Sequence, residues 1–303
     1  MTLIAILAAF GGGVFGASLG ALAAFSFVGV LVMIGVAVQL GVAPESTDFF
    51  ALPFGVFGPH VGGFAAGVGA AGYAAWRGKL DSGRSIAVGL MGIDCPDVLL
   101  VGGLYGVFGF MLERGLALIP GFGEGLPWTD TVAMTVLISA IVTRILFGKS
   151  GLLGEPLPGT TRYHPDPSVM WLPFQSHPLQ LATIGLGVGL LAGNLGVIFE
   201  GSGAYLAFGI AAASLIFLQM GLNIPVTHHI ALPAAIAAAA SHSVIWGGIV
   251  GMAGALLGEF IARTFHDHGD THFDPPGTTI AILTLILNGL TAAGFFSMAA
   301  IPY

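Results

Sequence analysis

Two histidines lie inside apolar stretches long enough to cross a membrane. His60 follows Gly58-Pro59, and His242 follows Ser241. An ionisable side chain at membrane depth is costly and usually has a function, and imidazole titrates near neutral pH, so it can carry a proton or hydrogen-bond a solute. We therefore expect both histidines, with Ser241, to line one central substrate cavity. The structural alternative is a neutral imidazole bonded to a neighbouring carbonyl.

Proline and glycine interrupt the same two stretches. Pro53 and Pro233 each follow Ala-Leu, and Gly58-Pro59 lies several residues into the first stretch. Proline removes a backbone donor and clashes with the preceding turn, so the pattern predicts broken helices whose free backbone groups can bind a solute. Pro53, Gly58, Pro59 and Pro233 are thus predicted substrate-binding residues, although a proline in the first turn of a helix is also structurally harmless.

Acidic residues stand at the start of two later apolar stretches. Asp94 and Asp274 each occur in the pattern Asp-x-Pro, which predicts helix N-caps with proline in the first turn. Asp97 lies one turn further into its stretch, where the second copy has Gly277 instead. We therefore interpret Asp97 as a binding group for a cation or proton at the cytoplasmic mouth of the path.

A segment rich in histidine and aspartate follows the second interrupted stretch. It contains His266, His268 and His272 with Asp267 and Asp270. Imidazole and carboxylate suit zinc and other divalent metals, so the three histidines form a candidate metal site. Their spacing matches no recognised ligand pattern, and a solvated loop is the alternative. The pair His228-His229, just before the second Ala-Leu-Pro, is a weaker candidate of the same kind.

The remaining motifs argue against a nucleotide-driven or hydrolytic enzyme. The sequence has no Walker A motif, nucleophile elbow or zinc-protease motif, and no convincing dinucleotide fingerprint. A single cysteine, Cys95, excludes an intrachain disulfide and any multi-cysteine site. We therefore expect no enzymatic activity and no cofactor.

Composition indicates the environment in which these residues must be positioned. Of 303 residues, 55% are hydrophobic and only 8% are charged, against roughly 25% charged in soluble domains. The chain is therefore predicted to be an all-α, multi-pass protein of the plasma or inner membrane, with the lipid bilayer as its main partner. Its 49 glycines favour close helix packing and homo-oligomers, and eight basic residues leave no patch for nucleic acid.

Two copies of one pattern predict how the helices are arranged. Ala-Leu-Pro at 51–53 and at 231–233 is followed, 41 residues after its proline, by Asp-x-Pro. We interpret the chain as about nine transmembrane helices in an inverted 4+1+4 repeat. The predicted units are a first repeat at residues 1–119, a connecting helix and cytoplasmic linker at 120–178, and a second, inverted repeat at 179–303. The run 233–262 is too long for one straight crossing, so it must tilt or break near Ser241-His242 or Gly247-Gly248.

Basic residues near helix ends predict the orientation, because they favour the cytoplasm. Placing 77–84 and 148–178 inside puts six of the eight bases there and leaves Arg114 and Arg263 outside. The N-terminus is then outside and the C-terminus cytoplasmic. Inverted halves with broken helices are typical of secondary transporters, so we expect a transporter or channel for a small solute or ion. The alternatives are a homo-oligomeric membrane scaffold and an intramembrane metal-dependent enzyme.

Overall fold

The computed structural model describes residues 2–41, 48–123 and 125–296. Within these ranges the chain folds into α-helices joined by turns and loops, without a named β-strand. The helices are α1 (Leu3–Leu19), α2 (Ala21–Gly41), α3 (Ala65–Trp76), α4 (Pro96–Ala117), α5 (Thr131–Phe147), α6 (Pro178–Gln219), α7 (His228–Ser241), α8 (Val244–Ile261) and α9 (Pro275–Ala292).

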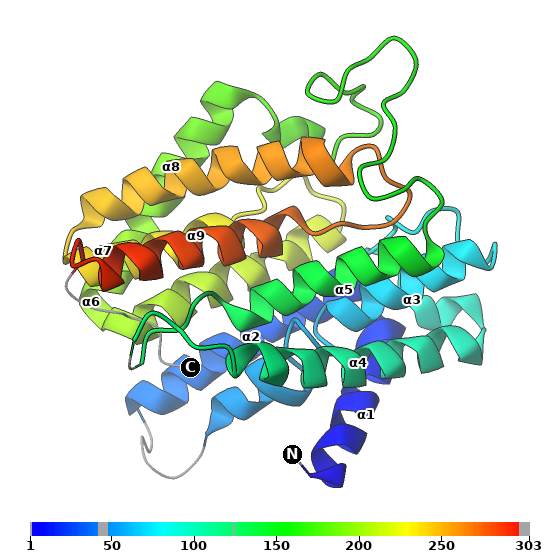
Figure 1. Ribbon diagram of the computed structural model, residues 1–303, viewed down its shortest axis with the longest axis horizontal. Helices are drawn as coiled ribbons and strands as arrows, with labels where there is room; N and C mark the ends of the chain where they lie inside the picture. The colour runs from blue at the N-terminus through cyan, green and yellow to red at the C-terminus, as the bar shows by residue number, and fades with distance from the viewer. Residues whose placement is uncertain (1, 42–47, 124, 297–303) are drawn as a thin grey trace.

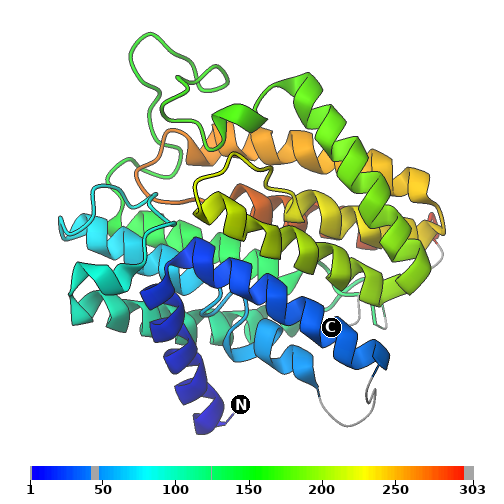
Figure 2. The same ribbon diagram turned by 180° about the vertical axis from the view of Figure 1, so that it is seen from behind.

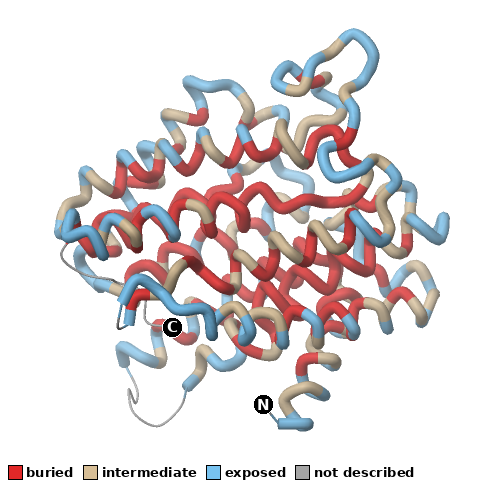
Figure 3. The backbone as a smooth tube through the Cα atoms, viewed as in Figure 1, coloured by how far each residue is buried: buried red, intermediate tan, exposed pale blue. Residues whose placement is uncertain are grey.

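Several helices have the length and apolarity needed to cross a membrane. By these two criteria α2, α4, α6, α9 and the segment Val244–His266 qualify, and α1 and α5 are shorter apolar helices. A chain with this many apolar helices is compatible with a multi-pass membrane location. Most of the helices run along a similar direction, and buried residues are concentrated where they meet in the middle of the molecule (Figures 1 and 3).

Loops gather at two ends of the helices (Figure 1). We call one end the basic face, made of loops 77–95, 148–177 and 262–274. The other end, the opposite face, includes loop 118–130 and the turn between α7 and α8. Hydrogen bonds join segments within each end: the Arg84 side chain bonds the Asp267 carbonyl on the basic face, and the Asn288 side chain bonds the Pro127 carbonyl on the opposite face.

The interruption predicted at Gly58-Pro59 is present. After a short π-helical turn at Leu52–Val56, with Gly55 in a non-helical conformation, the chain runs through irregular turns and resumes as α3 only at Ala65. The wide turn leaves backbone groups of this segment in the middle of the helical bundle, because α1, α2 and α4 pack against it.

The run predicted to tilt or break does break, and the chain then reverses direction. α7 ends at Ser241, His242 adopts a left-handed conformation with φ of 52°, and α8 begins at Val244. A Cβ at Gly254 would lie 3.0 Å from the carbonyl oxygen of His229, and one at Gly247 would lie 3.4 Å from that of Ala234. α7 and α8 are therefore an antiparallel hairpin and not one crossing.

This hairpin corrects the predicted topology. The predicted 4+1+4 arrangement places loop 262–274 on the face opposite to loops 77–84 and 148–178. Instead, His272 donates its main-chain N–H to the Gly83 carbonyl, and Arg162 bonds the carbonyl of Thr264. All three loops share the basic face, so the predicted position of loop 262–274, based on the contrasting loop charges, was wrong. The acidic residues of loop 262–274 balance bases on the same face.

Helix α6 also folds back on itself. Its 42 residues bend at Glu200, which has φ of 51° and ψ of −131°, and its two arms diverge from that point (Figure 2). The second arm packs against α2, and α6 as a whole packs against α7 and α8.

Glycine brings α6 and α8 into backbone contact. A Cβ at Gly189 would clash with the carbonyl oxygen of Gly247, and one at Gly185 would lie 2.8 Å from that of Gly251. Small residues permit such close approach where lipid supplies no hydrophobic drive for association. The close packing predicted from the glycine content is therefore confirmed within the chain.

A buried arginine fixes loop 262–274 to α5. The Arg144 guanidinium donates from Nε to the Thr271 hydroxyl at 2.7 Å and from Nη2 to the Thr271 carbonyl at 2.7 Å. Its Nη1 donates to the carbonyls of Leu152 and Phe265, each at 2.9 Å. These bonds hold the loop in the position from which its histidines reach the interior.

Candidate functional site

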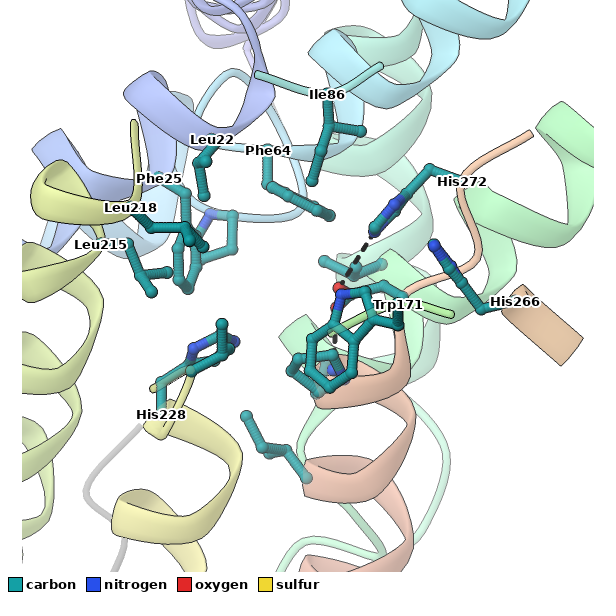
Figure 4. Close-up of a pocket in the computed structure, with 18 of the residues that line it drawn as sticks. Leu22, Phe25, Phe64, Ile86, Trp171, Leu215, Leu218, His228, His266 and His272 are labelled. Carbon is teal, nitrogen blue, oxygen red and sulfur yellow. Dashed lines mark hydrogen bonds and ion pairs between the residues drawn. The ribbon is translucent and has the colours of Figure 1, made fainter. Parts of the chain in front are cut away.

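A cavity of about 560 Å³ lies between helices from both parts of the chain (Figure 4). Its walls come from α2, α5, the second arm of α6, α7 and α9, together with the irregular segment before α3 and residues of the basic-face loops. Both the N-terminal and the C-terminal parts of the chain therefore build it. A volume of this size suits a small organic molecule.

The cavity is elongated along the helices. On the second arm of α6 it is lined from Tyr205 to Leu218, two residues that are thirteen positions apart and therefore separated by about 20 Å at the helical rise. Arg84, Ser85 and Ser168 lie at the end next to the basic face, and Asp130 lies at the other end. The cavity thus extends along much of a hydrocarbon core of about 30 Å.

Aromatic rings form much of the wall. Phe25 packs edge-on against Phe64 and Phe208, with ring centroids 5.7 and 5.8 Å apart. Phe54 stacks obliquely on Tyr205 at 5.1 Å. These side chains and Trp171 give the cavity a largely apolar lining, so each polar group in it is conspicuous.

Two histidines and an aspartate form one polar cluster. The rings of His266 and His272 lie 4.8 Å apart, and the edge of His272 faces Phe64 at 5.5 Å. His272 Nε2 lies 3.4 Å from Asp274 Oδ1, whose other oxygen accepts the Gly277 N–H at 2.8 Å and caps α9. Burial lowers the pKa of His272, and the bond to Asp274 opposes this shift.

Ring nitrogens in this cluster lack protein partners. The His266 and His272 residues are only 3% and 2% exposed. Nevertheless, both ring nitrogens of His266 and Nδ1 of His272 make no hydrogen bond among the described residues. A buried polar atom without a partner is unfavourable. Since both residues line the cavity, a solute in the cavity can supply the missing bonds.

A third histidine reaches the cavity from the start of α7. His228 is 6% exposed and its Nδ1 also lacks a partner, and its ring packs against Phe25 with centroids 4.7 Å apart. Thr227, the N-cap residue, makes no side-chain bond to the helix. α7 and α9 both begin beside the cavity (Figure 4), so their positive dipole ends contribute to its electrostatics.

Among the described residues, Arg84 is the one lysine or arginine that lines the cavity. Its Nη1 donates to the Asp267 carbonyl at 3.2 Å and its Nη2 to the Val169 carbonyl at 2.6 Å. Burial lowers the pKa of Arg84, and Asp267 opposes this shift, but arginine stays protonated at physiological pH.

Only part of the predicted site lies at the cavity. Pro59, His266 and His272 line it. Gly58 is buried beside the His60 ring, where a Cβ would lie 2.7 Å from Cε1. Pro53 is buried within the π-helical turn, and Pro233 is buried within α7.

His60 and His242 do not form the expected central pair. His60 is fully buried, and both its ring nitrogens lack a partner among the described residues; the cavity lining does not include it. His242 is exposed at the turn that follows α7. Ser241 donates to the Ala237 carbonyl at 2.7 Å, which is a local bond within the helix. The two interrupted stretches break at different depths, so their histidines do not meet.

Asp97 forms a surface cluster instead of lining the cavity. Its Oδ2 accepts bonds from the Tyr73 hydroxyl at 2.9 Å and from Arg77 at 2.7 Å. Of the two predicted N-caps, Asp274 caps α9, whereas Asp94 has a left-handed conformation and Cys95 takes the N-cap position of α4.

The three predicted metal ligands do not converge on one point: His266 and His272 are neighbours, but His268 is not part of their cluster. His268 bonds the Arg162 carbonyl at 3.0 Å, while Asp267 and Asp270 accept main-chain N–H groups of Trp171 and Lys149. Among the described residues, no three or more His, Cys, Asp or Glu side chains are placed to hold one metal ion.

The sequence reasoning did not assign Arg84, Asp130 or Trp171 to the site, and it gave His228 only as a weaker metal candidate. The His228-His229 pair was visible as a weak candidate, and its position directly before a proline-containing apolar helix was the usable signal. Arg84 and Trp171 belong to loops that fold back over the cavity, which local sequence does not indicate.

Comparison with known proteins was made for the whole chain. No curated protein and no solved structure matches it. One family model matches residues 1–165 and residues 156–303, and so covers all parts that form the cavity. By these matches the chain belongs to a family of unknown function, DUF7973.

Proposed function

We propose that the protein is a membrane transporter or channel that moves a small solute or ion through the cavity. The observation that carries this proposal is an elongated, mostly apolar cavity between helices from both parts of the chain, with buried polar groups that lack partners. A path of this kind is typical of carriers in which helices begin or break beside the substrate. The inverted repeat of residues 1–119 and 179–303 remains part of this proposal, and it is supported by the opposite directions of α1, which runs toward the basic face, and the first arm of α6, which starts there.

The proposal includes an orientation in the plasma or inner membrane. Arg263 bonds the carbonyls of Tyr163 and Ser176 in loop 148–177, so it belongs to the basic face. Seven of the eight basic residues then lie on that face, and Arg114 alone lies at the other end of the helices. By the preference of basic residues for the cytoplasm, the basic face is cytoplasmic.

This orientation places the two ends of the described chain outside. Gly20 caps the C-terminal end of α1, and a Cβ there would lie 2.9 Å from the carbonyl carbon of Val88 on the basic face, so α1 begins at the opposite face. Phe296 packs against Trp246 in the first turn of α8, also away from the basic face. The predicted cytoplasmic C-terminus concerns residues 297–303, which lie outside the described residues.

Flux through the cavity can be tested with single cysteines in proteoliposomes. On a Cys95→Ser background, Ser85→Cys and Ala133→Cys introduce thiols at the two ends of the cavity. Thr183→Cys places a matched thiol on an exposed part of α6. Uptake of acetate, benzoate, urea and glycerol is measured before and after a bulky thiol reagent is added.

We expect at least one solute to enter, and the reagent to block its uptake in the two cavity variants but not in Thr183→Cys. Absence of uptake of all four solutes, with correctly inserted protein, contradicts the transport function. Uptake that the reagent leaves unchanged in both cavity variants contradicts the assigned path.

A further inference from the structure

The charge distribution of the cavity indicates which solutes it accepts, and this inference rests on the proposed function. Arg84 lines the cavity, yet none of the ion pairs within 4.0 Å found among the described residues includes it. A guanidinium has five N–H donors. Two of these bond the carbonyls of Asp267 and Val169, which leaves three for a ligand.

The acidic side chains of the cavity are already engaged by helix starts. Asp274 accepts the Gly277 N–H and faces His272. Asp130 accepts the Ala133 N–H at 2.8 Å and caps α5. A carboxylate at a helix N-terminus is offset by the positive end of the helix dipole, so neither acid neutralises Arg84. The Asp267 charge partly offsets that of Arg84, but among the described residues no carboxylate lies within 4.0 Å of the guanidinium. Arg84 can therefore take an anionic partner at the end of the cavity next to the basic face.

Further nitrogens that can hydrogen-bond a ligand lie deeper in the cavity. His228, His266 and His272 each have a buried ring nitrogen without a protein partner among the described residues. The first turn of α7 has no side-chain cap, and free N–H groups at a helix N-terminus favour an anion. His228 reaches the cavity from one side, and His266 and His272 reach it from the other (Figure 4). A neutral imidazole donates from only one ring nitrogen, and in His272 that nitrogen faces Asp274, so His228 and His266 are the histidines that can donate to a ligand.

The other surfaces of the cavity suit an apolar body. Trp171 follows closely after Val169, which Arg84 bonds, and the rings of Phe25 and Phe208 line the wall beyond it. A fully polar anion, such as phosphate or sulfate, would lose its hydration against these rings without replacement. One charged group attached to an apolar or aromatic skeleton matches both parts of the cavity.

We propose that the cavity binds an organic monoanion, with a carboxylate at Arg84 and an apolar body among Phe25, Trp171 and Phe208. Arginine and carboxylate form paired, charge-assisted hydrogen bonds. The carboxylate comes either from a water-soluble acid that enters at the basic face or from a fatty acid of the bilayer.

The test compares three probes that share one ring and differ in charge. Benzoate, benzamide and benzylamine are titrated at pH 7 against the full chain in detergent, and the melting temperature reports binding. Palmitate is a fourth probe, which separates a lipid source from a soluble one. We expect benzoate or palmitate to raise the melting temperature, and benzamide and benzylamine to have little effect.

Variants assign the effect to the cavity. Arg84→Gln should weaken binding of the active acid about tenfold or more, as expected for loss of a charged hydrogen-bonded partner. Arg162→Gln is the matched control, because Arg162 also bonds three loop carbonyls but does not line the cavity. If Arg84→Gln does not fold, Arg84→Lys keeps the charge and should keep the preference for the acid over benzamide.

Other results overturn the inference. These are equal shifts with all three ring compounds, a preference for benzylamine, no shift with either acid, or unchanged acid binding in Arg84→Gln. Binding of the acid without any flux in proteoliposomes would leave this inference standing and remove the transport function instead.

Discussion

Buried arginines in this protein bind main-chain carbonyls more than carboxylates. Arg144 is 2% exposed and donates to three carbonyls and one hydroxyl. Its charge is partly offset by Asp270, which binds Lys149 N–H and the Ser150 hydroxyl nearby. Such bonds join segments more than a hundred residues apart, so single side chains on the basic face determine the shape of loop 262–274 and with it the cavity.

The Arg144→Gln variant tests this dependence. Glutamine cannot reach all four acceptors, and the acceptors left unpaired and buried should cost about 3 kcal/mol or more of unfolding free energy. Lys149→Gln is the control, because Lys149 is an exposed base on the same face and only its main-chain N–H makes a bond. Thermal unfolding in detergent measures the stability of both variants. If Arg144→Gln and Lys149→Gln are equally stable, the Arg144 side chain does not hold loop 262–274 in place.

At this scale the sequence indicated residue types but not their partners. His266 and His272 were recognisable as ionisable groups near an apolar stretch. Their assignment to a metal site depended on Asp267 and Asp270, whose oxygens accept N–H groups from residues 171 and 149. Such long-range bonds to backbone have no local sequence signal. For His60 the residue type was also recognisable, but its position inside an apolar run did not mean that it lines the cavity.

At the scale of elements, glycine determines how closely helices pack. α1 and α4 make a second contact of the same kind as α6 and α8: a Cβ at Gly13 would lie 3.0 Å from the Cα atoms of Gly103 and Gly106. The backbones are then in direct contact over several turns. Dispersion between many close atoms stabilises such pairs in lipid.

Two substitutions on one helix separate packing from helix propensity. Gly189→Ala should destabilise the protein by about 1 to 3 kcal/mol, because its Cβ would clash with Gly247 on α8. Gly187→Ala, two residues away, has no atom within 4 Å of its Cβ and should be neutral or stabilise by up to about 1 kcal/mol. The melting temperatures of both variants test this prediction. A loss of stability in Gly187→Ala alone would contradict the close packing of α6 and α8 at Gly189.

Element boundaries were predictable where composition changes sharply. The connecting helix predicted within residues 120–178 is present as α5, which Asp130 caps and which a polar linker follows. The breaks near Gly58-Pro59 and Ser241-His242 were also predicted. The reversal of direction after His242 was not, because hydropathy gives the length of an apolar run but not the direction in which the chain leaves a break. Because of this one reversal, every later segment lies at the other end of the helices from the end that was predicted.

At the scale of the molecule, the proposed orientation predicts which thiols can be labelled from each side. On the Cys95→Ser background, Glu155→Cys lies in the exposed linker of the basic face, and Ala293→Cys lies exposed just after α9. An impermeant reagent should label position 293 in intact cells and position 155 only in inverted vesicles. Labelling of both positions from the same side would contradict the proposed arrangement.

The burial of α7 has a consequence for how the protein is made. Every residue from His228 to Ala240 is buried, so this helix has almost no contact with lipid in the finished protein. Its 14 residues extend about 21 Å, too short to cross the membrane unaided. We therefore expect α7 to leave the translocation machinery together with α8, whose outer side presents leucine and isoleucine to the lipid. The cavity would then form only when this hairpin docks between α6 and α9, as a late step of biogenesis.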